Sequence, residues 1–185
     1  MNLSMGTIHQ SLPEQVISAI VSQHDVLFVV AAGNQGKDIT RMSASLCRIP
    51  APNLVCVAAV DGNDRLAGFP KASNYGRLVG LAGLGVDVPT FGSDGTVHRE
   101  TGTSLAAATV SGIAAEVWAS VPILTASELA GSLCAGARKS ANLNTVVRCG
   151  VVDLVGSVRW ARAEHRVRRS SRTDREQARR RAKTD

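Results

Sequence analysis

The chain has 185 residues, which fits a single domain large enough to bury a core. Hydrophobic residues make up 44% of it and aromatic residues only 3%, a composition typical of helices packed closely on a parallel sheet. Residues 1–158 hold 10 Lys and Arg against 11 Asp and Glu, whereas residues 159–185 hold 11 against 4. Because the excess positive charge is confined to one terminal run that has no aromatic residue after Trp160, it does not indicate a specific nucleic-acid-binding protein.

The cysteines and the apolar segments bear on three further features: zinc binding, membrane spans and a signal peptide. The sequence has no CxxC pair and no His at zinc-ligand spacing, so we expect no zinc site and at most two disulfides among Cys47, Cys56, Cys134 and Cys149. No run of about 18 apolar residues predicts a membrane span, and residues 1–15 lack the basic and apolar regions of a signal peptide. If the protein is secreted, we expect its targeting signal upstream of this chain.

The first predicted elements are a helix and a buried strand. Residues 13–24 begin with a proline suited to the first helical turn, and their apolar residues share one helical stripe, formed by Val16, Ile17, Ile20 and Val21. Residues 26–32 are an uninterrupted apolar run that ends at Gly33-Asn34, the pattern of a parallel strand buried on both faces. A helix followed by such a strand is part of a crossover unit.

Two further apolar runs, residues 53–60 and 78–82, repeat the strand pattern between turn residues. Together with the first strand they predict a sheet of at least three strands. The predicted fold class is therefore α/β, a three-layer parallel sheet with helices on both faces.

Three helices are predicted after these strands. Residues 103–118 are apolar nearly all round, which favours a central buried position. Thr125 and Glu128 have the spacing of a capping box and predict a helix over residues 126–137, and Asp153 is placed to cap a fourth helix through Trp160. From Arg162 the apolar periodicity gives way to Arg-rich sequence, so we expect a domain over residues 1–163 and a disordered basic tail over residues 164–185.

Ser104 is the first candidate for chemistry. It follows Gly102-Thr103 at the start of the predicted helix 103–118, where backbone amides can stabilise an oxyanion and a glycine leaves room for a substrate. This position suits a nucleophile in acyl transfer. The same string is typical of an ordinary helix N-cap, so this segment alone leaves both interpretations open.

Asn34 is the second candidate. It follows the buried strand 26–32, at the carboxyl end where open parallel sheets place their ligand sites. An Asn side-chain amide there is a suitable donor to an oxyanion. A simple strand-ending turn is the alternative interpretation, because Gly-Asn is common in turns.

Taken in order, several segments resemble the subtilase family, the subtilisin-like serine proteases, over about residues 1–163. The resemblance corresponds to the C-terminal half of such a catalytic domain. The segments that carry it are residues 2–6, 31–34, 73–85, 102–107 and 150–153.

The resemblance implies a serine endopeptidase that acts on polypeptides. It implies that Ser104 is the nucleophile and that the Asn34 side chain and the Ser104 amide form the oxyanion hole. The implied substrate-binding residues are Ser4, Met5, Gly6, Ala31, Ala32, Gly33, Gly102 and Thr103. No cofactor is expected, although the family allows structural calcium in the complete domain, and the full-length protein is expected to be secreted and to carry a propeptide.

Two departures from the family pattern are read as divergence: Ala108-Thr109 stands for Pro-His, and Gly83-Leu84-Gly85 stands for Ala-Pro-Gly. The larger departure is that the family's Asp-Thr-Gly and His-Gly-Thr-His segments are absent from these residues. The four histidines lie in unrelated settings and are interpreted as surface residues: His9, His24, His98 and His165.

A serine without a general base is a weak nucleophile, and loss of a triad member leaves residual catalysis on the order of 10³–10⁴ over water. We therefore expect this chain alone to be close to inactive and, without the strands of the other half, to expose an apolar sheet edge. The alternative function is a non-catalytic pseudoprotease or interaction module. A third, in which the basic tail binds nucleic acid or anionic membrane nonspecifically, has no support in the body of the chain.

Overall fold

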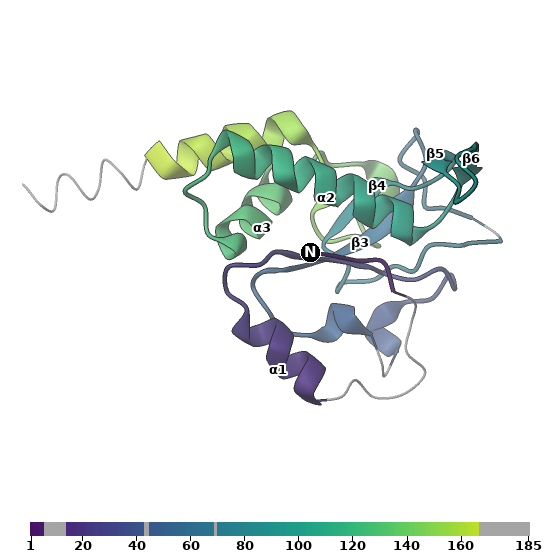
Figure 1. Ribbon diagram of the computed structural model, residues 1–185, viewed down its shortest axis with the longest axis horizontal. Coiled ribbons are helices and arrows are strands. Elements are labelled where there is room, and N and C mark those ends of the chain that lie inside the picture. The colour runs from purple at the N-terminus through teal and green to yellow at the C-terminus, as the bar shows by residue number, and fades with distance from the viewer. Residues whose placement is uncertain (6–13, 43–44, 69, 167–185) are drawn as a thin grey trace, which may run out of the picture.

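A parallel sheet forms the centre of the molecule, and helices cover both of its faces (Figure 1). The computed structural model describes residues 1–5, 14–42, 45–68 and 70–166. The sheet has five strands in the order β1-β2-β3-β4-β7, and every neighbouring pair is parallel. The strands are β1 (Asn2–Leu3), β2 (Phe28–Ala31), β3 (Leu54–Val60), β4 (Leu81–Leu84) and β7 (Gly150–Val151). This confirms the predicted α/β class.

Alternating side chains of the central strands build two separate cores. Val29, Val55 and Val57 face one cluster together with residues of α2 (Thr103–Ser120) and α3 (Ala126–Ala135). Phe28 and Val30 face the other, which also contains Ile20 of α1 (Glu14–Ser22). Because successive side chains of a strand point to opposite faces, a continuous apolar run is what a strand covered on both sides requires.

The first predicted helix is confirmed in part. In α1, Ile20 is buried and Ile17 packs against the same cluster, whereas Val16 and Val21 are more than a third exposed. The predicted first-turn residue Pro13 lies outside the described residues. The apolar stripe is therefore narrower than the sequence pattern indicates.

The third predicted strand is displaced along the chain. Strand β4 begins at Leu81 rather than at Leu78, which is 36% exposed. Glycines on and after β4 let α2 approach closely: a Cβ at Gly83 would lie 2.9 Å from Ala106 O, and one at Gly85 would lie 2.8 Å from Gly102 O. The departure from Ala-Pro-Gly at this place is thus accompanied by tight helix-to-sheet packing.

The prediction that helix 103–118 occupies a central buried position is confirmed in part: α2 packs against four strands of the sheet and against α3, but only one of its faces is buried. Helix α2 spans Thr103–Ser120 and buries one stripe that includes Ala106, Val110 and Val117, while Ala108 and Ala115 are exposed. Alanine is small enough that exposing it costs little, so an alanine-rich helix looks apolar all round even in an outer layer.

The two later helices form as the capping residues indicate. The Thr125 side chain accepts from Glu128 N, and Glu128 Oε2 accepts from Thr125 N, which completes the capping box of α3. Asp153 Oδ1 accepts from Gly156 N at the start of a helix that runs over residues 154–166. This helix passes the predicted end at Trp160, and residues 167–185 lie outside the described residues, so the disordered tail stays a prediction.

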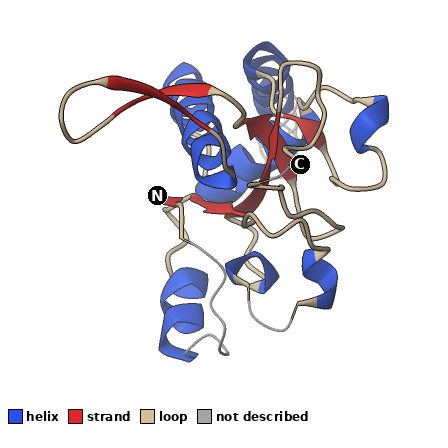
Figure 2. Ribbon diagram, turned by 90° about the vertical axis from the view of Figure 1, so that its right-hand side faces the viewer, coloured by secondary structure: helices blue, strands red, loops and turns tan. Residues whose placement is uncertain are grey.

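A hairpin that the sequence patterns did not indicate projects from the body (Figure 2). It consists of β5 (Val88–Phe91) and β6 (Val97–Glu100) in antiparallel register. Phe91 and Val97 lie opposite one another in that register and are 84% and 62% exposed.

Short 3₁₀ helices and two disulfides complete the fold. The 3₁₀ helices are η1 (Ile39–Arg41), η2 (Leu46–Arg48) and η3 (Ala141–Leu143). All four cysteines are paired, as Cys47–Cys56 and Cys134–Cys149. Among the described helices, none combines the length and the apolar character that a membrane crossing requires.

Candidate active site

Three elements bring the candidate residues together at the carboxyl edge of the sheet. Ser4 follows β1, Asn34 follows β2, and Ser104 lies in the first turn of α2. In parallel sheets this edge and the adjoining helix N-termini form the usual ligand site.

Ser104 is not the N-cap of α2. Gly102 occupies the N-cap position without a side-chain capping bond, and Ser104 is the second helical residue. Its half-buried hydroxyl donates only to Ser4 O at 3.4 Å, while the Ser4 hydroxyl donates to Ser104 O at 3.0 Å. The capping interpretation of Ser104 is therefore excluded, and its hydroxyl is left for another role.

Thr103 holds the Asn34 side chain in a fixed orientation. Asn34 Oδ1 accepts from Thr103 N at 2.8 Å and from Thr103 Oγ1 at 3.0 Å, and the same hydroxyl accepts from Gly33 N at 3.1 Å. A backbone N–H can bond only to the oxygen of the amide, so these contacts decide which way the amide faces. Among the described residues, Asn34 Nδ2 has no acceptor.

The second unpaired donor is the Ser104 amide. As a first-turn N–H of α2 it has no intrahelical partner, and no acceptor for it occurs among the described residues. Gly102 lies beside the Asn34 amide, since a Cβ added there would be 3.4 Å from Asn34 Nδ2. The Asn34 side chain is therefore next to the N-terminal, positive end of α2, and a larger residue at position 102 would crowd it.

The remaining predicted site residues are placed as follows. Ala31 and Ala32 are buried at the end of β2, and Gly33 has a φ of 100°, which favours glycine. Met5 is 51% exposed. Gly6 lies outside the described residues.

An ion pair lies in the segments that lead to the site. Lys71 Nζ donates to Glu100 Oε2 at 3.0 Å, and this hydrogen bond holds the pKa of Glu100 below its ordinary value. Both side chains are about half exposed, so solvent screens the pair and it contributes little to stability.

None of the described histidines forms a hydrogen bond with Ser104. His24 lies between α1 and β2, at the opposite edge of the sheet from Asn34. His98 lies on β6, with Nε2 2.5 Å from Thr96 Oγ1, and His165 lies on helix 154–166. His9 is outside the described ranges, within which no three His, Cys, Asp or Glu side chains are grouped to hold a metal ion.

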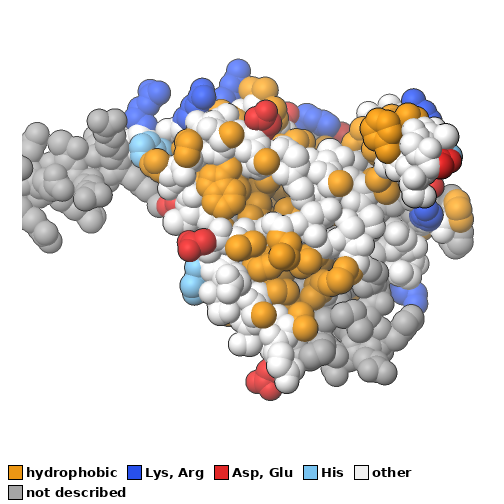
Figure 3. Space-filling view, viewed as in Figure 1, with side chains coloured by type: hydrophobic (Ala, Val, Ile, Leu, Met, Phe, Trp, Pro, Cys, Tyr) orange, Lys and Arg blue, Asp and Glu red, His pale blue; other side chains and the backbone are white. Residues whose placement is uncertain are grey.

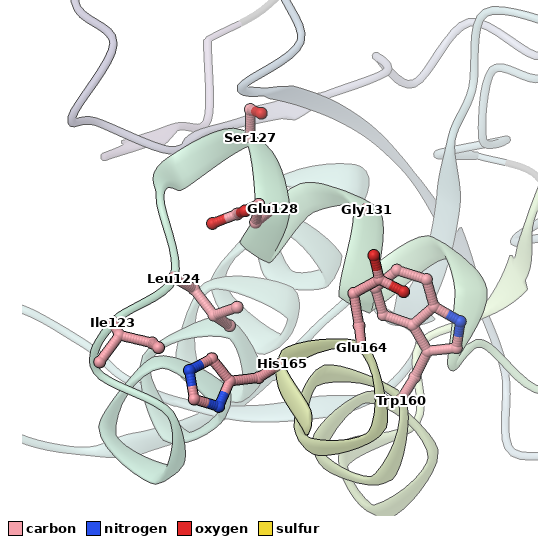
Figure 4. A pocket seen from close by; sticks show the side chains of 8 residues that line it. All are labelled: Ile123, Leu124, Ser127, Glu128, Gly131, Trp160, Glu164 and His165. Atoms are coloured by element: carbon pink, nitrogen blue, oxygen red, sulfur yellow. The ribbon is translucent and has the colours of Figure 1, made fainter. Parts of the chain in front are cut away.

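A cavity of about 400 Å³ lies away from this site, between α3 and helix 154–166 (Figure 4). It is lined by Ile123, Leu124, Ser127, Glu128, Gly131, Trp160, Glu164 and His165. Ile123 and Leu124 follow the C-terminus of α2, so the cavity and Ser104 are separated by about 24 Å of helix. The cavity is therefore not part of the site.

The sequence patterns did not single out Thr103 as the residue that orients Asn34, nor Asn74, which is completely buried beside the loop after β2. No pattern of spacing marks such residues, because their partners lie 69 and about 40 positions away in the chain. Only a buried polar residue within a recognised segment could have drawn attention to Asn74.

Comparisons with known proteins find relatives of this chain. The model of the subtilase family matches residues 1–152. The chain is 34% identical over 117 residues to subtilisin-like protease 2 of Pseudogymnoascus destructans, which covers 62% of this chain and 27% of that protein. It is 36% identical over 115 residues to a thermophilic serine proteinase of Bacillus sp. strain AK1, which covers 62% of this chain and 26% of that protein. The matched region is thus about a quarter of the length of these relatives.

Solved structures show the same fold. A structure of the subtilase cytotoxin SubAB assembly superposes with a TM-score of 0.72 at 23% identity, covering 88% of this chain and 59% of the other. The A-subunit of the AB5 toxin from E. coli superposes with a TM-score of 0.70 at 25% identity, covering 86% of this chain and 59% of the other.

Proposed function

Because the chain belongs to the subtilase family, we propose that it supplies the nucleophile and the oxyanion hole of a serine endopeptidase. One observation carries the proposal: Thr103 binds the oxygen of the Asn34 amide, so Nδ2 is left as a donor next to Ser104. A strand-ending turn needs no such orientation, whereas stabilisation of an oxyanion does.

In the proposed reaction, Ser104 Oγ attacks the carbonyl carbon of a peptide bond. The carbonyl oxygen takes up the negative charge of the tetrahedral intermediate and accepts hydrogen bonds from Asn34 Nδ2 and from the Ser104 amide. Collapse of the intermediate releases the amine and leaves an acyl ester on Ser104, which water hydrolyses.

The Ser104 proton must go to a base, and the only described partner of this hydroxyl is a backbone carbonyl, Ser4 O. A carbonyl oxygen does not take a proton at neutral pH. No described side chain is placed to take this proton, so we assign the general base and its carboxylate partner to polypeptide outside the described residues.

The free edge of β1 is the place where that polypeptide would bind. Among the described strands, only β2 pairs with β1, so one side of β1 offers unpaired backbone groups. Hydrophobic side chains gather on the face at which β1 is the edge strand (Figure 3), and Met1, Val16 and Val21 are exposed. A parallel strand added there would end beside Ser4 and Ser104, close enough to deliver a base.

A polypeptide substrate would bind next to the same edge. We place the residue before the scissile bond between the segments 4–6 and 31–33, with Gly102 and Thr103 beside the reacting carbonyl. The two disulfides support secretion of the full-length protein, because disulfides persist in oxidising compartments. We also propose that the full-length protein carries a propeptide.

The test supplies the missing base from solution. The chain is incubated with an acylated peptide p-nitrophenyl ester at rising imidazole concentration, and acylation of Ser104 is followed by mass spectrometry. We expect acylation that imidazole accelerates and that Ser104→Ala abolishes. The matched control is Ser111→Ala on the same helix, whose hydroxyl bonds to Ala107 O at 2.8 Å.

If wild-type acylation does not exceed that of the Ser104→Ala chain, the proposal fails and a non-catalytic module is the better reading. Sequencing the transcript upstream of residue 1 adds an independent check. In-frame Asp-Thr-Gly and His-Gly-Thr-His segments would locate the proposed carboxylate and base.

A further inference from the structure

Asn74 is a completely buried polar side chain that lies against the loop after β2. Its Oδ1 accepts from Gln35 N at 3.1 Å and from Lys37 N at 2.9 Å. Its Nδ2 donates to Ala32 O at 2.8 Å and to Gln35 Oε1 at 2.8 Å. Both donors and both acceptor positions of the amide are thereby used within residues 32–37.

The backbone around Asn74 follows the same loop. Asn74 N donates to Gly33 O at 2.9 Å, Gly36 N donates to Ala72 O at 2.8 Å, and Tyr75 N donates to Lys37 O at 3.0 Å. The residues on both sides of Asn34 are therefore held from the 72–75 segment, whereas the Asn34 side chain is held by Thr103.

Ser73 connects this segment to the centre of the sheet. Its hydroxyl accepts from Ala59 N in β3 at 3.0 Å and donates to Asn74 O at 2.9 Å. Ser73 and Asn74 thus connect strand β3, in which every residue except Leu54 is buried, to the loop that carries Asn34.

The loop needs this support because its own backbone is permissive. Gly33 and Gly36 both have positive φ values, 100° and 65°, and glycine moves readily among such conformations. Without Asn74, the amides of Gln35 and Lys37 and the carbonyl of Ala32 would lose their partners.

We propose that Asn74 is a positioning residue of the oxyanion hole, which sets the place of Asn34 Nδ2 through the loop 33–37. The proposal rests on the function assigned to Asn34 above. Asn74 does not touch the substrate. Because a misplacement of about 1 Å can cost about a hundredfold in rate, its loss lowers kcat for Ser104 acylation about tenfold to a hundredfold and leaves KM unchanged.

The first experiment does not depend on activity. The side-chain amide signals of Asn34 are recorded in the ¹⁵N-labelled chain and assigned through their loss in Asn34→Ala. We expect Asn74→Asp, which keeps the acceptors and removes the donor, and Asn74→Ala to shift or broaden these signals. Unchanged Asn34 signals in folded Asn74 variants would overturn the proposal.

The chain offers a matched control at the other edge of the sheet. Asn53 is also buried, and its Nδ2 donates to Gln23 O and to Val26 O, each at 2.7 Å. Asn53→Asp and Asn53→Ala therefore remove a comparable buried amide far from Asn34. We expect them to lower thermal stability and to leave the Asn34 signals in place.

The second experiment measures imidazole-supported acylation of Ser104 in the same chains. A fall in kcat at constant KM in the Asn74 variants, absent from the Asn53 variants, supports the positioning role, and an equal fall in both contradicts it. If the wild-type chain is not acylated, the proposed function fails, and the Asn34 signals still decide the role of Asn74.

If the Asn74 variants do not fold, hydrogen exchange in the wild-type chain tests whether Asn74 holds the loop 33–37. We expect the amides of Gln35 and Lys37 to exchange at least a hundredfold more slowly than unprotected amides, although both residues are exposed. Exchange at unprotected rates would show that Asn74 does not hold the loop.

Discussion

The two ends of α2 are built for different purposes. At its N-terminus, Thr103 forms hydrogen bonds with Asn34 and Ser104 forms one with Ser4, and two donors have no partner among the described residues. At its C-terminus, a cavity of about 400 Å³ opens between α3 and helix 154–166. The proposed function therefore uses the end of α2 that has oriented donors, and not the end that has the cavity.

The largest effect should come from the donor at the N-terminal end. Asn34→Ala should slow imidazole-supported acylation of Ser104 by about 10²–10³, or roughly 3–4 kcal/mol, because one oxyanion donor is lost. Single-turnover acylation of the peptide ester measures it. Asn144→Ala, which changes an exposed asparagine, is the control. Acylation at the wild-type rate in Asn34→Ala would show that Asn34 is not an oxyanion donor.

Packing along α2 gives the next largest effect. Gly83→Ala should lower the free energy of unfolding by about 1–3 kcal/mol, because its Cβ would be forced to within 2.9 Å of Ala106 O. Gly112→Ala should raise it by about 0.5–1 kcal/mol, because nothing outside the helix lies within 4 Å and alanine favours helix. Thermal unfolding followed by circular dichroism measures the stability of both variants. Equal melting temperatures for Gly83→Ala and the wild-type chain would mean that α2 does not pack tightly on β4.

The pH dependence of stability should arise away from both ends of α2. Arg138 donates to Asp64 at 2.6 Å and 2.8 Å, and this hydrogen bonding lowers the pKa of Asp64, whose side chain is only 15% exposed. Because the pKa is lower in the folded chain, the stabilisation is complete above the ordinary Asp pKa of about 3.9 and is lost as the pH falls through the lowered value.

Asp64→Asn tests this pair and tolerates the local φ of 60°. Urea unfolding should show a loss of about 1 kcal/mol at pH 7 that shrinks as the pH falls through the lowered pKa of Asp64. A loss that does not change over this pH range would assign it to hydrogen bonding or packing rather than to the charge.

The smallest effect is expected at the C-terminal end. Ile123 is 61% exposed on the wall of the cavity, so Ile123→Ser should change the free energy of unfolding by less than about 0.5 kcal/mol and leave acylation unchanged. Urea unfolding and the acylation assay measure both quantities. Slower acylation would couple the two ends of α2 and weaken the contrast between them.

Several elements followed from local pattern alone. The apolar runs at β2 and β3 predict strands that are covered on both faces, because they are short, rich in Val and bounded by turn residues. Thr125 and Glu128 cap α3 as their spacing predicts, since a capping box involves only four consecutive residues. Strand β4 began three residues later than predicted, and the β5–β6 hairpin carries too few apolar residues to mark its strands.

The sequence by itself determined the α/β class, the chain order of Asn34 and Ser104, and the resemblance to the family. The tertiary structure decided that Gly102 rather than Ser104 takes the N-cap, that Thr103 orients the Asn34 amide, and that Asn74 supports its loop. The physical reason is distance along the chain: a period or a cap is set by neighbours within a few residues, whereas the donors of this site are oriented by partners that meet only when the sheet has formed.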